Sequence, residues 1–570
     1  MSRNITRRTF LINASRLAGA AVAAGPSFLG QSCSSMNRFD LLIRGATVYD
    51  GTGRPGFPAD IGIVGGRIRT LGPVADGAAK RTIDAGGLAA APGFIDVHEH
   101  TDIDLLVNYR AESMIRQGVT TVVGGNCGES AFPLSDEMMV RRRKSLREDY
   151  GLELSWQEAG GFFRRLEEQG IAINYASLVG LGTVRAIVVG HENRRATPAE
   201  LERMDKLVQE ALSAGAVGVS TGLEYTPGSF ADEAELIALC RTAAEMGGLY
   251  ATHMRDEEEF VLEAVDEAIR IARGAGAKLQ VSHLKIGYAR NWPKFDDLVR
   301  RVEAAAASGV DIFCDRYPYT AWSTGLTSFF PLWAREGTTK DFLARLENPA
   351  LEARLRSEVG EKEELMGGWD KVIISSVTTE KNKPAEGRDV QTLSKGAGKD
   401  AFAYLRDLLL EEEGEVSQIT FAMSEDHLKR LLAHPLVGVA SDGSAVAPYG
   451  PLAEGNPHPR LYGTFPRALG KYVREEKVTT LEEMIRKMTS VPAARFGFAG
   501  RGTMAPGQWA DVVLFDPERI SDRATWQDPE QYPVGIDYVV VNGQVVVERG
   551  EHNGGRPGRV LRLGKDGRAE

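Results

Sequence analysis

Hydrophobic residues in the middle of the chain come in short continuous runs, separated by longer stretches with helical periodicity. The eight runs have the length and apolar character of strands that are buried on both faces. Between them, in Glu233–Met246 and Glu257–Ala272, apolar residues recur every three or four positions, as on one face of a helix. This alternation is typical of a parallel α/β fold, and eight such units predict a (β/α)8 TIM-like barrel. The predicted strands are Gly93–Val97, Val119–Val123, Ile173–Val179, Val217–Ser220, Leu249–Thr252, Lys278–Ser282, Val310–Cys314 and Leu436–Ala440.

One connection in this pattern is much longer than the others. About 120 residues separate the seventh predicted strand from the eighth, far more than a connecting helix needs. We therefore expect an inserted lobe or lid over the mouth of the barrel at residues 325–415. The barrel itself would then comprise residues 93–324 and 416–496.

The two ends of the chain share a different pattern, in which short β segments are interrupted by glycine. Leu41–Gly45 and Ile61–Gly66 show it near the start, and Asp511–Phe515 and Tyr538–Val547 show it near the end. Within the last segment, Asn542 and Gly543 form a dipeptide that is typical of a tight hairpin turn. We expect one small β-sandwich built from both termini, residues 36–92 and 497–570.

Composition narrows the class of protein. The chain has 570 residues, of which 43% are hydrophobic and 26% charged, as in a soluble globular protein, and its net charge is −10. A negative chain without a basic cluster beyond its first residues argues against a nucleic acid partner and leaves a small-molecule substrate as the expectation. Four cysteines in so long a chain cannot form a disulfide framework. The oligomeric state is left open.

Residues 1–35 have the features of a twin-arginine export signal. Thr6–Leu11 contains the arginine pair, Ala18–Gly25 is a run of small residues, and no acidic residue precedes Asp40. We expect a periplasmic or cell-envelope protein, with a disordered basic leader as the alternative. Cys33 is a candidate for lipid attachment, which would be the only membrane contact, although Gly30–Ser32 lacks the leucine usual three positions before such a cysteine.

Candidate metal ligands follow several of the predicted strands. His98 and His100 come directly after the first strand, where residues two apart project from the same face. Cys127 follows the second strand, His253 the fifth and His283 the sixth. Because the carboxyl ends of barrel strands meet at one rim, these side chains should converge there. Imidazole nitrogen and thiolate sulfur are ligands that zinc prefers.

Asp442, after the eighth strand, adds a carboxylate at the same rim. Each residue also has a simpler interpretation when it is taken alone. His253 and His283 are compatible with hydrogen-bonded core histidines, Cys127 with a small buried apolar residue, and Asp442 with a turn or helix cap. Their common position after the strands favours a metal site over several separate coincidences.

Over residues 39–547 the chain resembles the D-aminoacylase, or N-acyl-D-amino-acid deacylase, branch of the amidohydrolase superfamily. The order and number of the similar blocks carry this resemblance. They are A-P-G-F-I-D-V-H-E-H-T-D, R-Q-G-V-T-T-V-V-G-G-N-C-G, S-T-G-L-E-Y-T-P-G, G-G-L-Y-A-T-H-M-R-D-E, V-S-H-L-K, D-R-Y-P-Y-T-A-W-S-T, A-S-D-G, H-P-R-L-Y-G-T-F-P-R-A-L-G and K-M-T-S-V-P-A-A-R-F-G.

The resemblance implies roles for the candidate ligands. Cys127, His253 and His283 are similar to the ligands of a tightly held zinc, and His98 and His100 to those of a second, weaker site that Cys127 can bridge. Most of the superfamily carries a carboxylated lysine on the fourth strand instead. Val217–Ser220 contains no lysine, which separates this branch from the hydantoinases. Asp442 is similar to the carboxylate that contacts metal and acts as general acid and base.

The resemblance also implies how substrate is held. Arg460 is similar to the arginine that binds the substrate carboxylate, and Lys285, Tyr317 and Ser323 match positions that assist it; the residues alone are equally compatible with surface or packing roles. The loop from Asp442 to Arg460 is longer than in many relatives, which leaves substrate preference open. The expected function is zinc-dependent hydrolysis of N-acyl-D-amino acids. The alternatives are a related D-peptide or cyclic-amide hydrolase and an inactive periplasmic binding protein.

Overall fold

The computed structural model describes residues 39–453 and 455–570, so the predicted export signal and Cys33 lie outside the described residues. Eight parallel strands form its centre, and every residue in them is buried, which explains their continuous apolar runs. Each overlaps a predicted strand. They are β6 (Phe94–Asp96), β7 (Val119–Gly124), β8 (Asn174–Ser177) with its continuation β9 (Val179–Gly180), β10 (Gly218–Gly222), β11 (Leu249–His253), β12 (Leu279–Val281), β13 (Ile312–Arg316) and β17 (Val437–Val439).

These strands close into a barrel. Hydrogen bonding runs from β6 through β7 to β8, and from β9 through β10, β11, β12 and β13 to β17. The remaining seam is closed just beyond β6 and β17, where the Asp442 amide donates to the His98 carbonyl at 2.8 Å and the His100 amide donates to the Gly443 carbonyl at 2.7 Å. The predicted (β/α)8 architecture is therefore confirmed, and its last seam already brings His98 and Asp442 together.

Helices surround the barrel with their apolar faces inward. On α8, for example, Val261, Val265 and Ala268 are buried against the strands. This helix begins at Val261, four residues later than predicted, because Glu257 remains in the loop at the strand end and turns toward the site. The helices are α1 (Asp104–Val107), α2 (Glu112–Ile115), α3 (Asp136–Tyr150), α4 (Ala159–Gln169), α5 (Leu181–Val188), α6 (Pro198–Ser213), α7 (Glu233–Glu245), α8 (Val261–Ala275), α9 (Phe295–Ala307), α14 (Glu425–Ala433), α15 (Arg460–Arg467), α16 (Leu481–Met488) and α17 (Ser490–Arg495).

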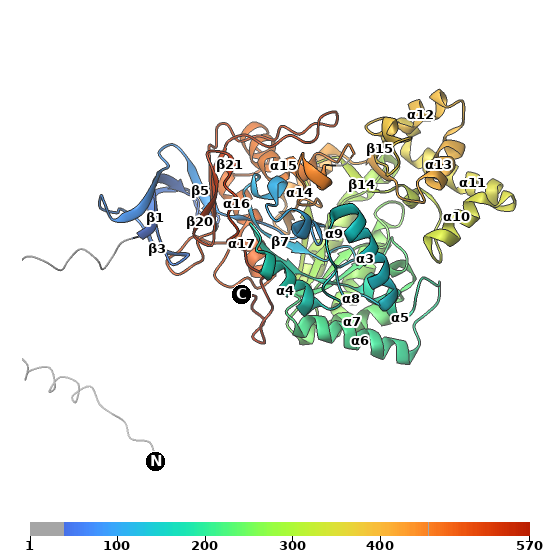
Figure 1. Cartoon of the computed structure of the whole chain (residues 1–570), viewed down its shortest axis with the longest axis horizontal. Helices are drawn as coiled ribbons and strands as arrows, with labels where there is room; N and C mark the ends of the chain where they lie inside the picture. Colours follow the sequence, from blue (N-terminus) through green and yellow to red (C-terminus); the bar gives the residue numbers. More distant parts are fainter. Residues whose placement is uncertain (1–38, 454) are drawn as a thin grey trace, which may run out of the picture.

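Strands from both ends of the chain form one nine-stranded sheet with a core of its own, at one end of the molecule (Figure 1). The predicted hairpin turn lies at Asn542 and Gly543, both with positive φ, between β19 and β20. The strands are β1 (Phe39–Val48), β2 (Phe57–Val64), β3 (Arg67–Leu71), β4 (Ala79–Asp84), β5 (Ala89–Pro92), β18 (Val512–Phe515), β19 (Ile536–Val541), β20 (Gln544–Glu548) and β21 (Glu551–His552).

The last residues of the chain leave this sheet, so the predicted range 497–570 is too long for it. Beyond β21 the chain runs back along the barrel, where the Tyr175 amide donates to the Arg559 carbonyl and the Leu561 amide to the Tyr175 carbonyl. Leu561 and Ala569 are buried with Ile95 and other side chains of the barrel strands. The C-terminal segment therefore belongs to the barrel core.

An inserted lobe lies at the opposite end of the molecule from the terminal sheet (Figure 1). Its small sheet, in the order β14-β16-β15, begins and ends outside the predicted limits of 325–415, so the lobe extends from 321 to 421. It buries a separate apolar cluster around Phe330 and Leu405. Its elements are β14 (Ala321–Gly325), α10 (Thr339–Glu347), α11 (Pro349–Met366), β15 (Val372–Ser376), α12 (Val390–Gly396), α13 (Ala401–Glu411) and β16 (Ser417–Phe421).

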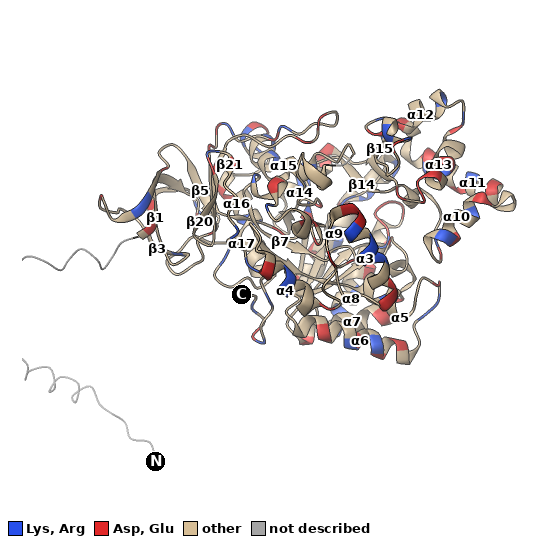
Figure 2. Cartoon of the chain, in the orientation of Figure 1, with Lys and Arg blue, Asp and Glu red and all other residues tan. Residues whose placement is uncertain are grey.

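Figure 2 shows acidic and basic residues interspersed along the outer helices, α3 and α6 among them, and along the lobe helices. Within the described residues, no helix combines the length and the apolar character that a membrane span requires. Cys127, Cys240 and Cys314 are buried and unpaired with one another.

Candidate metal centre

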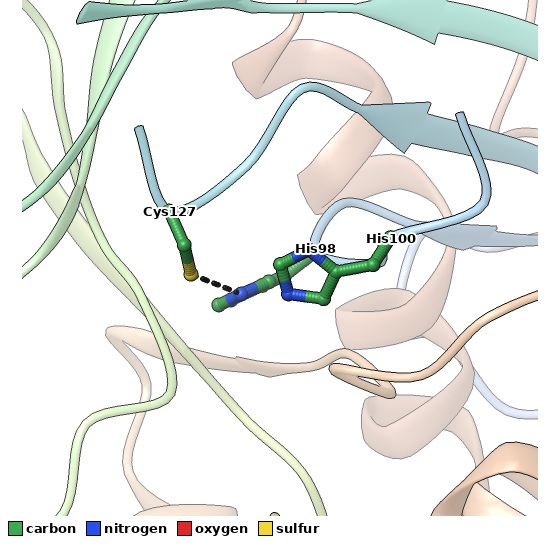
Figure 3. A group of neighbouring side chains, drawn as sticks. All are labelled: His98, His100 and Cys127. Atoms are coloured by element: carbon green, nitrogen blue, oxygen red, sulfur yellow. Dashed lines mark hydrogen bonds between the residues drawn. The ribbon is translucent and has the colours of Figure 1, made fainter. Parts of the chain in front are cut away.

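Side chains from several strand ends converge on the sulfur of Cys127, which lies in the loop after β7. Its Sγ is 3.3 Å from His98 Nε2, 3.8 Å from His253 Nδ1 and 3.9 Å from His283 Nε2. His100 enters the same group from the β6 side, as Figure 3 shows. All five predicted imidazole and thiol ligands therefore meet in one place.

The spacing of these atoms fits a zinc ion. Tetrahedral zinc, with its usual bond lengths to sulfur and nitrogen, sets those ligand atoms about 3.6 Å apart. The separations from Cys127 to His253 and His283 lie close to that value. Desolvation by burial raises the pKa of the Cys127 thiol. The charge of His98 and the hydrogen bonds to the histidine rings outweigh this effect and hold the pKa well below its usual range. A thiolate is the form that binds metal.

The backbone at three of these positions is in the left-handed region. Cys127 has φ 50°, His283 φ 36° and Asp442 φ 51°, which costs about 1–3 kcal/mol for each residue that is not glycine. The loop before Cys127 also needs glycine at Gly125, which has φ 73° and where a Cβ atom would lie 2.1 Å from the Leu178 carbonyl oxygen. The fold therefore holds the ligand side chains in place against local strain.

Carboxylates behind the rings, Asp315 and Glu257 buried and Glu224 29% exposed, orient three of the histidines. Asp315 Oδ1 lies 3.0 Å from His98 Nδ1, Glu224 Oε2 lies 3.0 Å from His253 Nε2, and Glu257 Oε1 lies 2.9 Å from His283 Nδ1. Each contact leaves the opposite ring nitrogen facing the sulfur. Such carboxylate–histidine pairs fix the tautomer and raise the basicity of a metal ligand.

The sequence alone does not single out these three acids. Asp315 directly follows the seventh predicted strand, and it also accepts the His283 backbone amide at 2.7 Å. Glu224 and Glu257 lie in the loops after the fourth and fifth strands. Like the metal ligands, these acids follow a predicted strand, and that position is the feature by which the sequence could have indicated them. Glu224 and Glu257 also lie in two of the blocks that carry the family resemblance, S-T-G-L-E and T-H-M-R-D-E.

Asp442 lies between the histidines and Arg460. Its Oδ1 is 3.1 Å from His100 Nε2 and 3.4 Å from His98 Nε2, and its Oδ2 is 2.8 Å from Arg460 Nη1. Burial by itself would raise the pKa of this carboxyl. The positive charges of Arg460 and His98 outweigh that effect and hold the pKa of Asp442 well below its usual range. Asp442 is therefore an ionised acceptor beside the cluster.

The predicted substrate-binding residues occupy different positions around the site. Lys285 and Ser323 line the same cavity as Arg460, and the Ser323 carbonyl accepts from Arg460 Nη2 at 3.5 Å. Lys285 forms a buried ion pair with Glu257. Tyr317 does not line the cavity. It is buried behind Arg460, whose guanidinium lies 4.8 Å from its ring centroid.

The cavity over the cluster has a volume of about 340 Å³. Its inner wall carries the ligand residues, and its outer wall comes from the lobe, through Trp322 in β14 and Lys362 in α11. Lys362 is paired with Glu258 in the loop before α8, which ties the lobe to the barrel. The lobe therefore covers one side of the site.

The sequence of this chain is similar to those of known proteins over most of its length. The model of the Amidohydrolase family matches residues 81–350 and 397–547. A D-aminoacylase from Alcaligenes xylosoxydans xylosoxydans is 36% identical over 93% of this chain and 99% of its own length.

Solved structures agree with this result. An N-acyl-D-glutamate deacylase from Bordetella bronchiseptica, complexed with zinc and a phosphonate inhibitor, is similar at 36% identity with a TM-score of 0.79, over 92% of this chain and all of that one. A D-aminoacylase described with a binuclear metal centre has 35% identity and a TM-score of 0.77 over the same shares. The closed barrel with its cluster of metal-binding side chains thus defines a metal-dependent hydrolase. The chain belongs to the amidohydrolase family.

Proposed function

We propose that this chain hydrolyses the amide bond of N-acyl-D-amino acids, releasing a carboxylate and a free D-amino acid. The observation that carries the proposal is the meeting of four histidines, Cys127 and Asp442 directly beside Arg460. The names of the similar proteins, a D-aminoacylase and an N-acyl-D-glutamate deacylase, support the same substrate class. Chirality rests on these relatives alone.

Zinc is the metal we assign to the cluster. Cys127, His253 and His283 would hold the tight ion, and His98 and His100 would hold a second, weaker one that Cys127 can bridge. Bound zinc lowers the pKa of water to about 7 and polarises an amide carbonyl. The sulfur-to-nitrogen spacings and the carboxylates behind the rings support this donor set.

Asp442 carries the proton transfers of this reaction. Its ionised carboxylate accepts a proton from the attacking water and delivers it to the nitrogen of the departing amine. The carboxylate is buried and contacts both His100 and Arg460, so its position is fixed before substrate arrives. A pure binding protein would have no use for such a proton carrier.

Arg460 supplies the cation that binds the substrate carboxylate. Its planar guanidinium offers several parallel donors, which suit a carboxylate better than a single ammonium group does. Lys285 and Ser323 lie around the same cavity and assist it. Tyr317 acts as a positioning residue, because its buried ring supports Arg460 from behind.

The decisive experiment compares enantiomers. Purified protein with zinc is incubated with N-acetyl-D-methionine or N-acetyl-L-methionine, and released amine is measured. We expect release from the D form only, its loss after chelation, and its return with zinc. Equal release from both forms contradicts the proposal. Turnover of a hydantoin alone would instead assign the cyclic-amide alternative, and zinc-dependent binding without release would assign the binding-protein alternative.

We further propose that the chain is exported by the twin-arginine route to the periplasm or cell envelope. The arginine pair at Arg7 and Arg8 and the small-residue run Ala18–Gly25 support it. Changing both arginines to lysine should retain the protein in the cytoplasmic fraction, whereas changing Arg3 and Arg16 to lysine should not. Export of the first variant would contradict the proposal. Labelling with a radioactive fatty acid that depends on Cys33 would identify a lipoprotein.

A further inference from the structure

A second cavity reaches the cluster from the side of α3, and Thr338 of the lobe also lines it. Its volume is about 660 Å³, roughly twice that of the first, and α3 forms one of its walls. Four lining residues are common to both cavities: His100, Cys127, Glu129 and Tyr225. The cluster therefore lies at the junction of two chambers.

The proposed function assigns the first chamber to the amino-acid half of the substrate. Arg460, Lys285 and Ser323 all line that chamber, and none of them lines the second. An amide bond that is positioned for attack at the cluster has its two halves on opposite sides of the carbonyl carbon. The acyl half therefore extends into the second chamber.

The second chamber is charged where it meets the cluster. Glu129 is exposed within it and, among the described residues, its carboxylate makes no hydrogen bond or ion pair. Asp102, the neighbouring acid, is already occupied: it accepts the Tyr175 hydroxyl at 2.5 Å and the Gly125 amide at 3.2 Å. Glu129 is thus the acid at the junction whose oxygens are all available to a ligand.

The position of Glu129 specifies where a complementary cation would lie. It is two residues from Cys127 in the chain and lines both chambers, so it is adjacent to the reacting carbonyl rather than at the far end of the acyl chamber. In an aminoacyl group, the protonated amine is one carbon away from that carbonyl. An acetyl or longer alkyl group would place only carbon beside the carboxylate and leave its charge unpaired.

We propose that the acyl group this enzyme prefers is an aminoacyl group, with its ammonium paired to Glu129, so that dipeptides with a D-residue at the C-terminus are substrates. This inference rests on the proposed function. Water adds its oxygen to the peptide carbonyl carbon, the carbon–nitrogen bond breaks, and the proton from water passes to the leaving nitrogen. The products are two free amino acids, one of them D.

The test uses two substrates of equal shape and different charge. Glycyl-D-methionine and N-glycoloyl-D-methionine differ only by an ammonium in place of a hydroxyl. We expect kcat/KM to favour the glycyl substrate by at least about tenfold, the size of one charge-assisted hydrogen bond. Glu129→Gln should bring this ratio close to one. Glu148→Gln, an exposed acid on α3 that lines neither chamber, should leave the ratio unchanged.

A wild-type ratio near one, or a ratio that survives Glu129→Gln, overturns the inference. So does a preference for N-succinyl-D-methionine that is lost in Arg142→Gln, because the half-buried Arg142 in the same chamber would then be selecting an anion. Hydrolysis of N-acetyl-D-methionine distinguishes a failure of this inference from a failure of the proposed function. If it occurs without a glycyl preference, only this inference fails, and if no N-acyl-D-methionine is hydrolysed, the proposed function fails with it.

Discussion

Asp442 is the residue whose removal should separate chemistry from metal binding. Asp442→Ala removes the proton carrier but leaves Cys127, His253 and His283, so zinc should remain bound while kcat falls by about 10²- to 10⁴-fold. Steady-state rates with N-acetyl-D-methionine and metal analysis of the same sample check both parts. A normal rate would remove Asp442 from the mechanism.

Arg460 should affect substrate binding more than turnover. Arg460→Ala removes a charge-assisted contact to the substrate carboxylate, so KM for N-acetyl-D-methionine should rise by about tenfold or more and kcat should change less. Arg467→Ala is a matched control, because Arg467 ends the same helix, α15, and pairs with Asp522 away from the site. An unaltered KM in the Arg460 variant would mean that another cation holds the carboxylate.

Some residues of the site could be predicted from the sequence, and others could not. The histidines, Cys127 and Asp442 could be predicted to meet because strand ends converge at one rim of a barrel. Asp315 and Glu257 could not be singled out, since acids after strands are common and only the fold shows which of them faces a ring nitrogen. The same holds for Tyr317, whose place behind Arg460 depends on how its ring packs.

At the scale of elements, strand β21 contains a histidine that should make stability depend on pH. His552 Nε2 lies 3.1 Å from the Arg110 carbonyl oxygen, to which it donates, and its Nδ1 accepts the Gly554 amide at 2.8 Å. The contact at Nδ1 requires the neutral ring, because a proton on that nitrogen would face the Gly554 N–H group. Burial, and the nearby charge of Arg110, lower the pKa of His552 to about 4.

The lowered pKa of His552 makes the folded state less stable as the pH falls. Between pH 6.5 and 4 the unfolded chain binds a proton that the folded chain does not, so the contribution of His552 is present above pH 6.5 and is lost as the pH falls to 4. In His552→Gln the urea midpoint should fall less steeply over that range than in the parent chain. His434→Gln, whose ring pairs with the exposed Glu303, serves as the control. Parallel pH curves for His552→Gln and the parent would contradict the assignment.

Most elements could be predicted from periodicity, and their ends could not. All eight barrel strands overlap their predicted ranges because residues buried on both faces leave an unbroken apolar run. Helix α8 begins later than its pattern indicated, because the loop residue Glu257 contacts His283 and Lys285 instead of continuing the helix. Tertiary contacts at the site decide that boundary, and no local pattern contains them.

For the whole molecule, the sequence predicted which parts exist but misplaced their limits. The lobe includes β14 and β16, on either side of the predicted range, because its small sheet pairs Ala321 with Phe421 across a hundred residues of intervening chain. The predicted range 497–570 places the C-terminal segment in the terminal sheet, whereas the structure places it against the barrel. Its pairing with Tyr175 joins residues far apart in sequence, which periodicity does not reveal.

That C-terminal segment should stabilise the barrel rather than the sheet. Leu561 is fully buried among side chains of the barrel strands, so Leu561→Ala should lower the free energy of unfolding by about 2–5 kcal/mol. Urea unfolding followed by tryptophan fluorescence measures the change, and Leu332→Ala, at a partly exposed leucine of the lobe, is the control. Equal effects of the two substitutions would show that the segment adds nothing to the barrel core. A larger effect at Leu561 means that the end of the chain stabilises the barrel whose rim carries the metal ligands.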